Sequence, residues 1–70
     1  MTRFNWIEAP VWAQYAAIDR DGEGDWLACR PDAYKGMWLP GLEDIRIHKI
    51  GESMLMEGEN WADTLEERPV

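Results

Sequence analysis

The chain has 70 residues, with 14 acidic against 7 basic side chains and a formal net charge of −7 at pH 7. This length allows one domain, residues 1–70, which buries only about 60% of the surface exposed by the unfolded chain. The charge argues against direct binding to nucleic acid or to an anionic membrane, because both depend on clustered Lys and Arg. A basic protein surface is the better partner, although the charge also keeps a tryptophan-rich chain soluble.

Aromatic burial is the main expected source of stability. The single cysteine, Cys29, and the single histidine, His48, exclude an internal disulfide and a zinc site with four Cys or His ligands. Five tryptophans remain, and aromatic side chains bury about 150–250 Å² each. A lone thiol and an N-terminus without an apolar signal segment lead us to expect a cytoplasmic protein, and no pattern indicates a cofactor.

Residues 11–50 are predicted to form an antiparallel β-meander of three to four strands. Two apolar-rich runs flank residues 19–24, DRDGEG, whose residue types are those of a tight hairpin turn. A third strand is expected over residues 34–39, and the period-two alternation of residues 45–50 predicts a fourth. Residues 53–56 fit either a short fifth strand or a turn of helix. In the fourth strand, the expected inward side chains are Ile45 and Ile47.

The length of the hairpin loop decides which side chains share a face. With an even number of loop residues, the better core face carries Trp12, Gln14, Ala16, Ile18, Leu27 and Cys29. Tyr15, Trp26 and Arg30 then share the second face, as an aromatic patch of residue types typical of binding hot spots. An odd loop with a bulge would exchange the faces of one strand.

The two ends of the chain are expected to pack onto the meander. Residues 1–10 form an arm anchored by Trp6. Residues 60–68 predict a short C-terminal α-helix, in which Trp61 and Leu65 lie four positions apart and share a face. Because so short a helix is unstable alone, it must dock, and it either covers the second face of the hairpin or leaves that face to a partner. The expected fold is therefore α+β.

The hairpin turn is strongly acidic. Its carboxylates are Asp19, Asp21, Glu23 and Asp25. They occupy relative positions 1, 3, 5 and 7 of an EF-hand loop, but position 12 is Arg30, where calcium needs a bidentate Glu, and the flanks predict strands. We therefore interpret the stretch as an acidic turn and assign no metal.

Catalysis is not expected from this sequence. His48 alternates with isoleucines in a predicted strand, and neither Cys29 nor Ser53 is placed beside it as a nucleophile. The turn glycines lack the helix and lysine that complete a phosphate loop. A chain with one thin core also has little capacity for a desolvated pocket.

Both ends of the chain carry a resemblance. Residues 5–22 read NWIEAPVWAQYAAIDRDG, Arg30 precedes a proline, and residues 61–69 read WADTLEERP. These motifs resemble those of small accessory proteins of tailed bacteriophages and prophages, W-x-x-A-P-x-W-A-Q-Y-A-A-x-D-x-D-G and W-x-x-[S/T]-L-E-x-R-P. Asp25 and Ala28 depart from the more aromatic strand of those proteins. The resemblance implies an origin inside an infected bacterium, and it assigns no activity or functional residue.

The function expected from these observations is binding of a host or phage protein without catalysis. The predicted contacts are the aromatic patch Tyr15, Trp26 and Arg30 and the acidic turn Asp19, Asp21, Glu23 and Asp25. One form of this hypothesis is inhibition of a basic protein that binds nucleic acid or acts in defence. The alternative is a structural role, as a homodimer, a larger homo-oligomer or a minor virion component.

Overall fold

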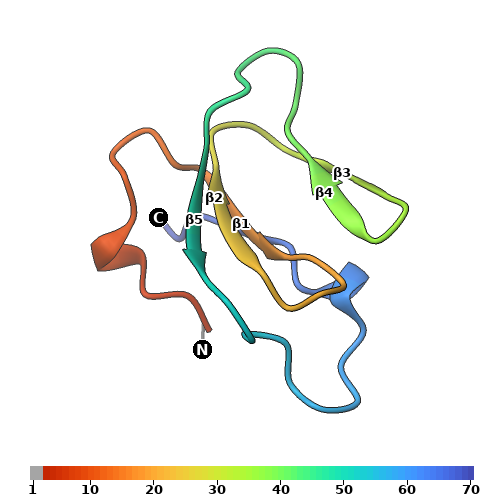
Figure 1. The fold of residues 1–70 in the computed structure, drawn as a ribbon. Helices are drawn as coiled ribbons and strands as arrows, with labels where there is room; N and C mark the ends of the chain where they lie inside the picture. Colours follow the sequence, from red (N-terminus) through yellow and green to blue (C-terminus); the bar gives the residue numbers. More distant parts are fainter. Residues whose placement is uncertain (1–2) are drawn as a thin grey trace.

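A computed structural model describes residues 3–70, which form a small, mainly β fold of two antiparallel sheets (Figure 1). The larger sheet has the strand order β5-β2-β1-β6, and β3 pairs with β4 in a separate ribbon. The strands are β1 (Tyr15–Ile18), β2 (Gly24–Leu27), β3 (Asp32–Tyr34), β4 (Met37–Leu39), β5 (Ile47–Gly51) and β6 (Glu66–Glu67). The only helical elements in this part of the chain are two 3-10 turns, η1 (Trp6–Glu8) and η2 (Trp61–Asp63).

The predicted C-terminal α-helix is wrong, and with it the α+β class. Asn60 does cap a turn, since its side chain accepts a hydrogen bond of 3.1 Å from the N–H of Ala62. The turn ends after η2, and β6 then pairs antiparallel with β1. Eight residues form few helical hydrogen bonds, so pairing with an existing strand outweighs the local helical signal.

The predicted small antiparallel sheet is confirmed, but the meander order is wrong, because residues 34–39 do not form a third strand of that sheet. They turn back at Lys35 and Gly36, whose φ angles of 49° and 87° match a type I′ hairpin turn. The strand β5 lies near the expected fourth strand, but Ile45 and Ile47 are 66% and 45% exposed and do not face inward. Residues 53–56 are neither strand nor helix.

The hairpin of β1 and β2 is confirmed, with an odd loop. Residues 20–22 form the loop, which is closed by a hydrogen bond of 2.9 Å from the N–H of Asp19 to the carbonyl of Glu23. The strand register pairs Tyr15 with Leu27, Ala16 with Trp26, Ala17 with Asp25 and Ile18 with Gly24. Trp26 therefore leaves the face of Tyr15, and the even-loop assignment of faces is wrong.

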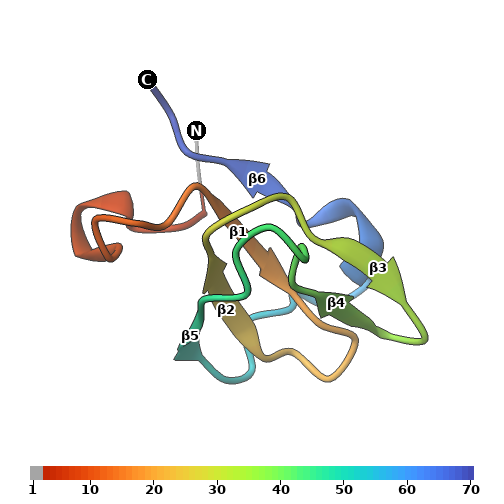
Figure 2. The same cartoon turned by 90° about the horizontal axis from the view of Figure 1, so that it is seen from above.

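Residues 3–10 of the arm and the ribbon cover opposite sides of β1 and β2 (Figure 2), and the first two residues of the predicted arm lie outside the described part of the chain. On one side, Trp26 packs against Phe4 and Trp6, with ring centroids 6.1 Å and 4.9 Å away. On the other side, Trp38 of β4 packs with buried Leu27 and meets the ring of Trp61 edge-on at 5.7 Å. The thin sheet thus has a separate aromatic cluster on each face.

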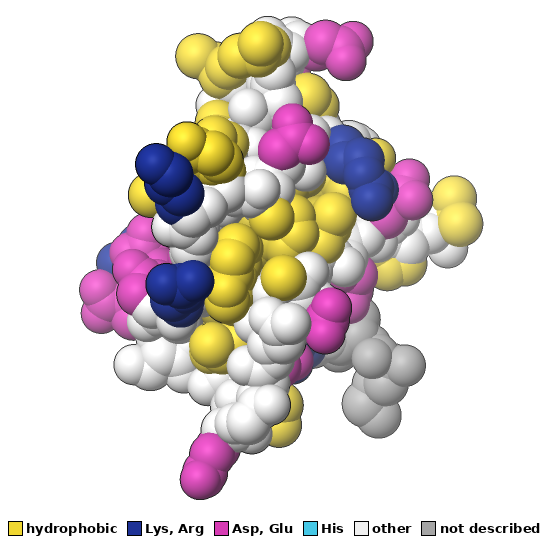
Figure 3. Space-filling view, turned by 90° about the vertical axis from the view of Figure 1, so that its right-hand side faces the viewer, with side chains coloured by type: hydrophobic (Ala, Val, Ile, Leu, Met, Phe, Trp, Pro, Cys, Tyr) yellow, Lys and Arg dark blue, Asp and Glu magenta, His cyan; other side chains and the backbone are white. Residues whose placement is uncertain are grey.

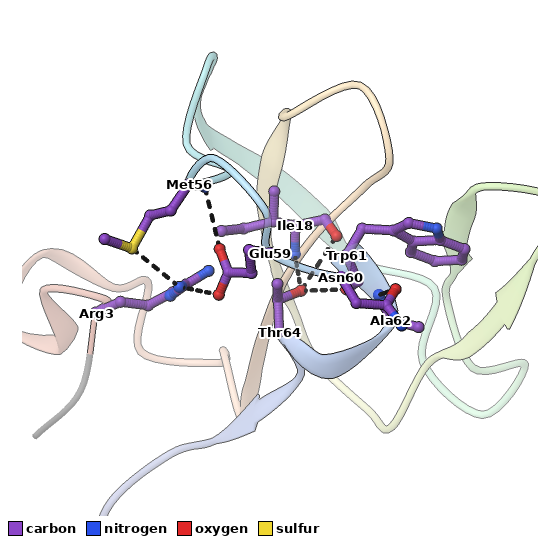
Figure 4. Close-up of polar contacts among 8 residues, drawn as sticks. All are labelled: Arg3, Ile18, Met56, Glu59, Asn60, Trp61, Ala62 and Thr64. Atoms are coloured by element: carbon purple, nitrogen blue, oxygen red, sulfur yellow. Dashed lines mark hydrogen bonds and ion pairs between the residues drawn. The ribbon is translucent and has the colours of Figure 1, made fainter.

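Thr64 fixes the C-terminal segment to the end of β1 (Figure 4). Its hydroxyl oxygen accepts a hydrogen bond of 2.8 Å from the N–H of Ile18, and it lies 2.8 Å from the carbonyl oxygen of Trp61. Nearby, Arg3 forms an ion pair with Glu59. Thr64 thus ties the C-terminal segment to the sheet, and Arg3 ties the arm to the stretch before η2.

Candidate functional site

The predicted aromatic patch is not assembled. Trp26 is buried, with 4% of its surface exposed, beneath the N-terminal arm. Tyr15 lies on the opposite face, half-buried, and Arg30 is exposed after the end of β2. Tyr15 and Arg30 line an open hollow of about 600 Å³, which Trp26 does not reach. The odd loop separates these residues, because it moves Trp26 to the other side of the sheet.

The same odd loop brings three of the four predicted acidic residues together. Asp19, Glu23 and Asp25 each place one carboxylate oxygen within 4.8 Å of the other two. Asp21 is turned into the loop, where its Oδ1 accepts a hydrogen bond of 3.0 Å from the N–H of Glu23. The three clustered residues are here called the acidic triad.

Asp19 connects the triad to the ribbon. Its Oδ1 accepts a hydrogen bond of 2.8 Å from the N–H of Trp38. The pKa of Asp19 lies above its ordinary value, because burial disfavours the charged form and outweighs that hydrogen bond. Beside it, the N–H of Arg20 donates a bond of 2.8 Å to the carbonyl of Gly36 in the ribbon turn. The acidic turn and the ribbon turn are therefore neighbours.

Asp25 is the most enclosed member of the triad, with 8% of its surface exposed. Within residues 3–70 its carboxylate receives no hydrogen bond and forms no ion pair. Every fully enclosed side-chain nitrogen or oxygen in residues 3–70 has a hydrogen-bond partner. Because the carboxylate of Asp25 has none, its oxygens must keep some contact with solvent. Burial, with the charges of Asp19 and Glu23, raises the pKa of Asp25 to about 6.

Lys49 supplies the nearby positive charge. It stands opposite Asp25 in the pairing of β2 with β5. Its Nζ lies 2.8 Å from Glu52 and 3.4 Å from Glu23, and these carboxylates raise the pKa of Lys49. Among the triad carboxylates, Lys49 thus lies beside Glu23 and opposite Asp25.

A second candidate site is the side of the ribbon that faces away from the sheet. Trp38 points toward the sheet, so period two directs its strand neighbours outward. With their cross-strand partners, the outward residues are Asp32, Tyr34, Met37 and Leu39. We call this set the outer ribbon face. Its three large apolar residues are exposed: Tyr34 by 53%, Met37 by 47% and Leu39 by 39%.

Figure 3 views the molecule from the ribbon side and shows hydrophobic side chains gathered amid basic and acidic ones. The outer ribbon face was not expected, because the sequence pattern of residues 34–39 predicts one continuous strand. The signal that could have found it was the dipeptide Lys35-Gly36, since glycine at the second position suits a turn with positive φ.

The chain matches no protein-family model, no curated protein and no solved structure. The likeness to phage accessory proteins therefore stays a prediction. Neither 3-10 turn in residues 3–70 is long and apolar enough to cross a membrane. What the chain does must be argued from the acidic triad and the outer ribbon face.

Proposed function

We propose that this chain is a small acidic accessory protein of a bacteriophage or prophage, which acts without catalysis by binding a host or phage protein in the bacterial cytoplasm. The origin rests on the resemblance of residues 5–22 and 61–69. The observation that carries the binding role is the outer ribbon face, where three large apolar side chains stand exposed on two paired strands. Exposed apolar groups of this kind are typical of interaction sites.

The ribbon is well anchored for such a role. Trp38 donates a hydrogen bond of 3.0 Å from Nε1 to the carbonyl of Ile18, and its backbone N–H is bound by Asp19. These bonds hold the inner side of the ribbon on the sheet, which keeps Tyr34 and Met37 directed outward. A preorganised face loses less entropy when it binds, so more of the contact energy remains as affinity.

Charge indicates the kind of partner. The acidic turn is hydrogen-bonded to the ribbon turn through Arg20 and Gly36, so carboxylates border the apolar face. The whole chain carries −7. A partner with an apolar contact edged by Lys and Arg is the best complement, and such proteins include those that bind nucleic acid. Inhibition of a protein of that kind is one form of the proposed role.

The test is capture from a bacterial lysate by the immobilised protein at low and high salt. Met37→Asp places a charge on the outer ribbon face, and Val11→Asp adds the same charge at a residue that is 92% exposed elsewhere. We expect captured proteins to be lost with Met37→Asp, retained with Val11→Asp and reduced by salt. Identical capture by all three proteins would contradict the proposal.

A structural role would use the same face, with a second copy of the chain as the occupant. Light scattering on the purified protein distinguishes the two. A monomer supports binding of a different partner. A stable dimer that Met37→Asp dissociates and Val11→Asp does not would replace that role by self-association, despite the repulsion between two copies of charge −7.

A further inference from the structure

The acidic triad has the geometry of a cation site. One oxygen from each of Asp19, Glu23 and Asp25 lies within 4.8 Å of the other two. Calcium binds oxygen at about 2.3–2.6 Å, so two ligands on opposite sides of one ion are about 5 Å apart. A single ion can therefore contact all three carboxylates without movement of the backbone. We propose that Asp19, Glu23 and Asp25 bind one divalent cation, with Ca²⁺ as the occupant.

The state of Asp25 is a separate observation that points to a ligand. As a residue Asp25 is only 8% exposed, its carboxylate is directed into the triad, and it has no hydrogen bond or ion pair within residues 3–70. Buried carboxylates are normally paired or hydrogen-bonded, because the charge is otherwise poorly solvated. An ion at this place supplies the missing partner, and the remaining solvent contact of the carboxylate gives the ion access.

The charges around the triad match a divalent ion. Three carboxylates and the ammonium of Lys49 sum to a charge of −2 if all are ionised. Lys49 also pairs with Glu52 at 2.8 Å, a shorter contact than the 3.4 Å to Glu23, so it can release Glu23 to the ion. With oxygen ligands alone, the site suits hard cations, and an irregular hairpin turn suits the flexible coordination of Ca²⁺ better than the strict octahedron of Mg²⁺.

This site differs from an EF-hand loop. An EF-hand needs a bidentate Glu at its twelfth position, which here is Arg30. The triad instead takes Asp19 from just after β1, Glu23 from just before β2 and Asp25 from within β2. The odd loop aligns Asp19 with Glu23 and places Asp25 on the same side. The absent twelfth ligand therefore does not count against it.

The test is calorimetric titration of the chelator-treated protein with CaCl₂ at constant ionic strength near neutral pH. We expect one ion per chain, bound with a dissociation constant below about 1 mM. Glu23→Gln and Asp25→Asn should each weaken binding by about tenfold or more, as loss of a charged ligand does. Glu8→Gln, which removes the same charge at an exposed position of η1 on the arm, should keep the affinity within about threefold.

Several results would overturn the site. These are no saturable binding up to about 10 mM Ca²⁺, an equal effect of Glu8→Gln and Glu23→Gln, or tighter binding of Mg²⁺ than of Ca²⁺. Circular dichroism checks the fold of each variant, and partly exposed Glu23 provides the test if Asp25→Asn does not fold. Met37→Asp should leave the titration unchanged, so the cation site and the proposed partner binding fail independently.

Discussion

The hydroxyl of Thr64 accepts a hydrogen bond of 2.8 Å from the backbone N–H of Ile18, which lies 46 positions earlier in the chain. Thr64 is 5% exposed, so no solvent replaces this bond easily. The strand β6 covers only Glu66–Glu67, and Thr64 continues its hydrogen bonding to the end of β1 by means of a side chain. The contact between the C-terminal segment and β1 therefore extends beyond the two backbone-paired residues of β6, as far as Ile18.

The first prediction removes that hydroxyl. Thr64→Val keeps the shape of the side chain and leaves the N–H of Ile18 without an acceptor, so the free energy of unfolding should fall by about 1–3 kcal/mol. Thr64→Ser keeps the hydroxyl and should lose less. Urea unfolding followed by tryptophan fluorescence measures both. A Val variant as stable as the wild type would show that the bond contributes nothing.

The second prediction concerns pH. The pKa of Asp25 is raised to about 6 in the folded protein, so the folded state holds a proton that the unfolded state releases at lower pH. The stabilisation from this group is present below about pH 4 and is lost as the pH rises through about 6. In the presence of a chelator, the free energy of unfolding of Asp25→Asn should therefore rise relative to that of wild type as the pH increases from about 4 through about 6, by about 2–3 kcal/mol in total.

Unfolding of both proteins across this pH range measures the difference. Glu57→Gln, at an exposed loop position, is the control and should show a difference from wild type that changes little with pH. A constant difference for Asp25→Asn would mean that burial does not raise the pKa of Asp25.

The third prediction tests the ribbon turn. Lys35 has a φ of 49°, a conformation that Asn adopts more readily than Lys, and Gly36 follows with a φ of 87°. Lys35→Asn should raise the free energy of unfolding by about 0.5–1 kcal/mol, and Gly36→Ala should lower it by about 1–2 kcal/mol. Thermal unfolding gives both values, and opposite signs to these would exclude the type I′ turn.

The fourth prediction is steric. A Cβ added at Gly41 would lie 2.4 Å from Sγ of Cys29 and 3.0 Å from the carbonyl oxygen of Arg30. Gly41→Ala should therefore destabilise the protein by about 1–3 kcal/mol. At Gly51 the nearest atom outside its chain neighbours is 3.7 Å away, so Gly51→Ala is the control and should cost less. Equal losses in chemical denaturation would contradict the crowding at Gly41.

The turn DRDGEG shows where sequence reasoning reached its limit. It predicted a hairpin correctly, but two glycines compete to close the loop. Gly22 closes it, with a φ of 91°, while Gly24 lies in β2, where a Cβ would come within 2.5 Å of Sδ of Met54. Gly24 is therefore needed for its contact with Met54, a residue far along the chain that the turn sequence does not indicate. Loop parity then decided which faces Trp26 and Asp25 occupy, so the wrong patch and the missed triad have one cause.

The C-terminal segment failed for a different reason. The capping signal of Asn60 was correct over one turn, as the bond to the N–H of Ala62 shows. Beyond it, Glu66 and Glu67 pair with Tyr15 and Ala16, a contact between the two ends of the chain that no local pattern reports. Tertiary pairing overrides weak local propensity in such short segments.

The strand order of the larger sheet has a consequence for a broken chain. The central hairpin, β1 with β2, is flanked on one edge by β5 and on the other by β6, which both follow the exposed Leu42 in sequence. A single proteolytic cut after Leu42 would leave two fragments. The second fragment would contain β5 and β6, which pair with the two edges of the β1–β2 hairpin in the first. Such fragments should reassociate on mixing, so the cleaved protein can remain a folded complex. In a meander cut once between two strands, the two fragments would share only one pair of strands.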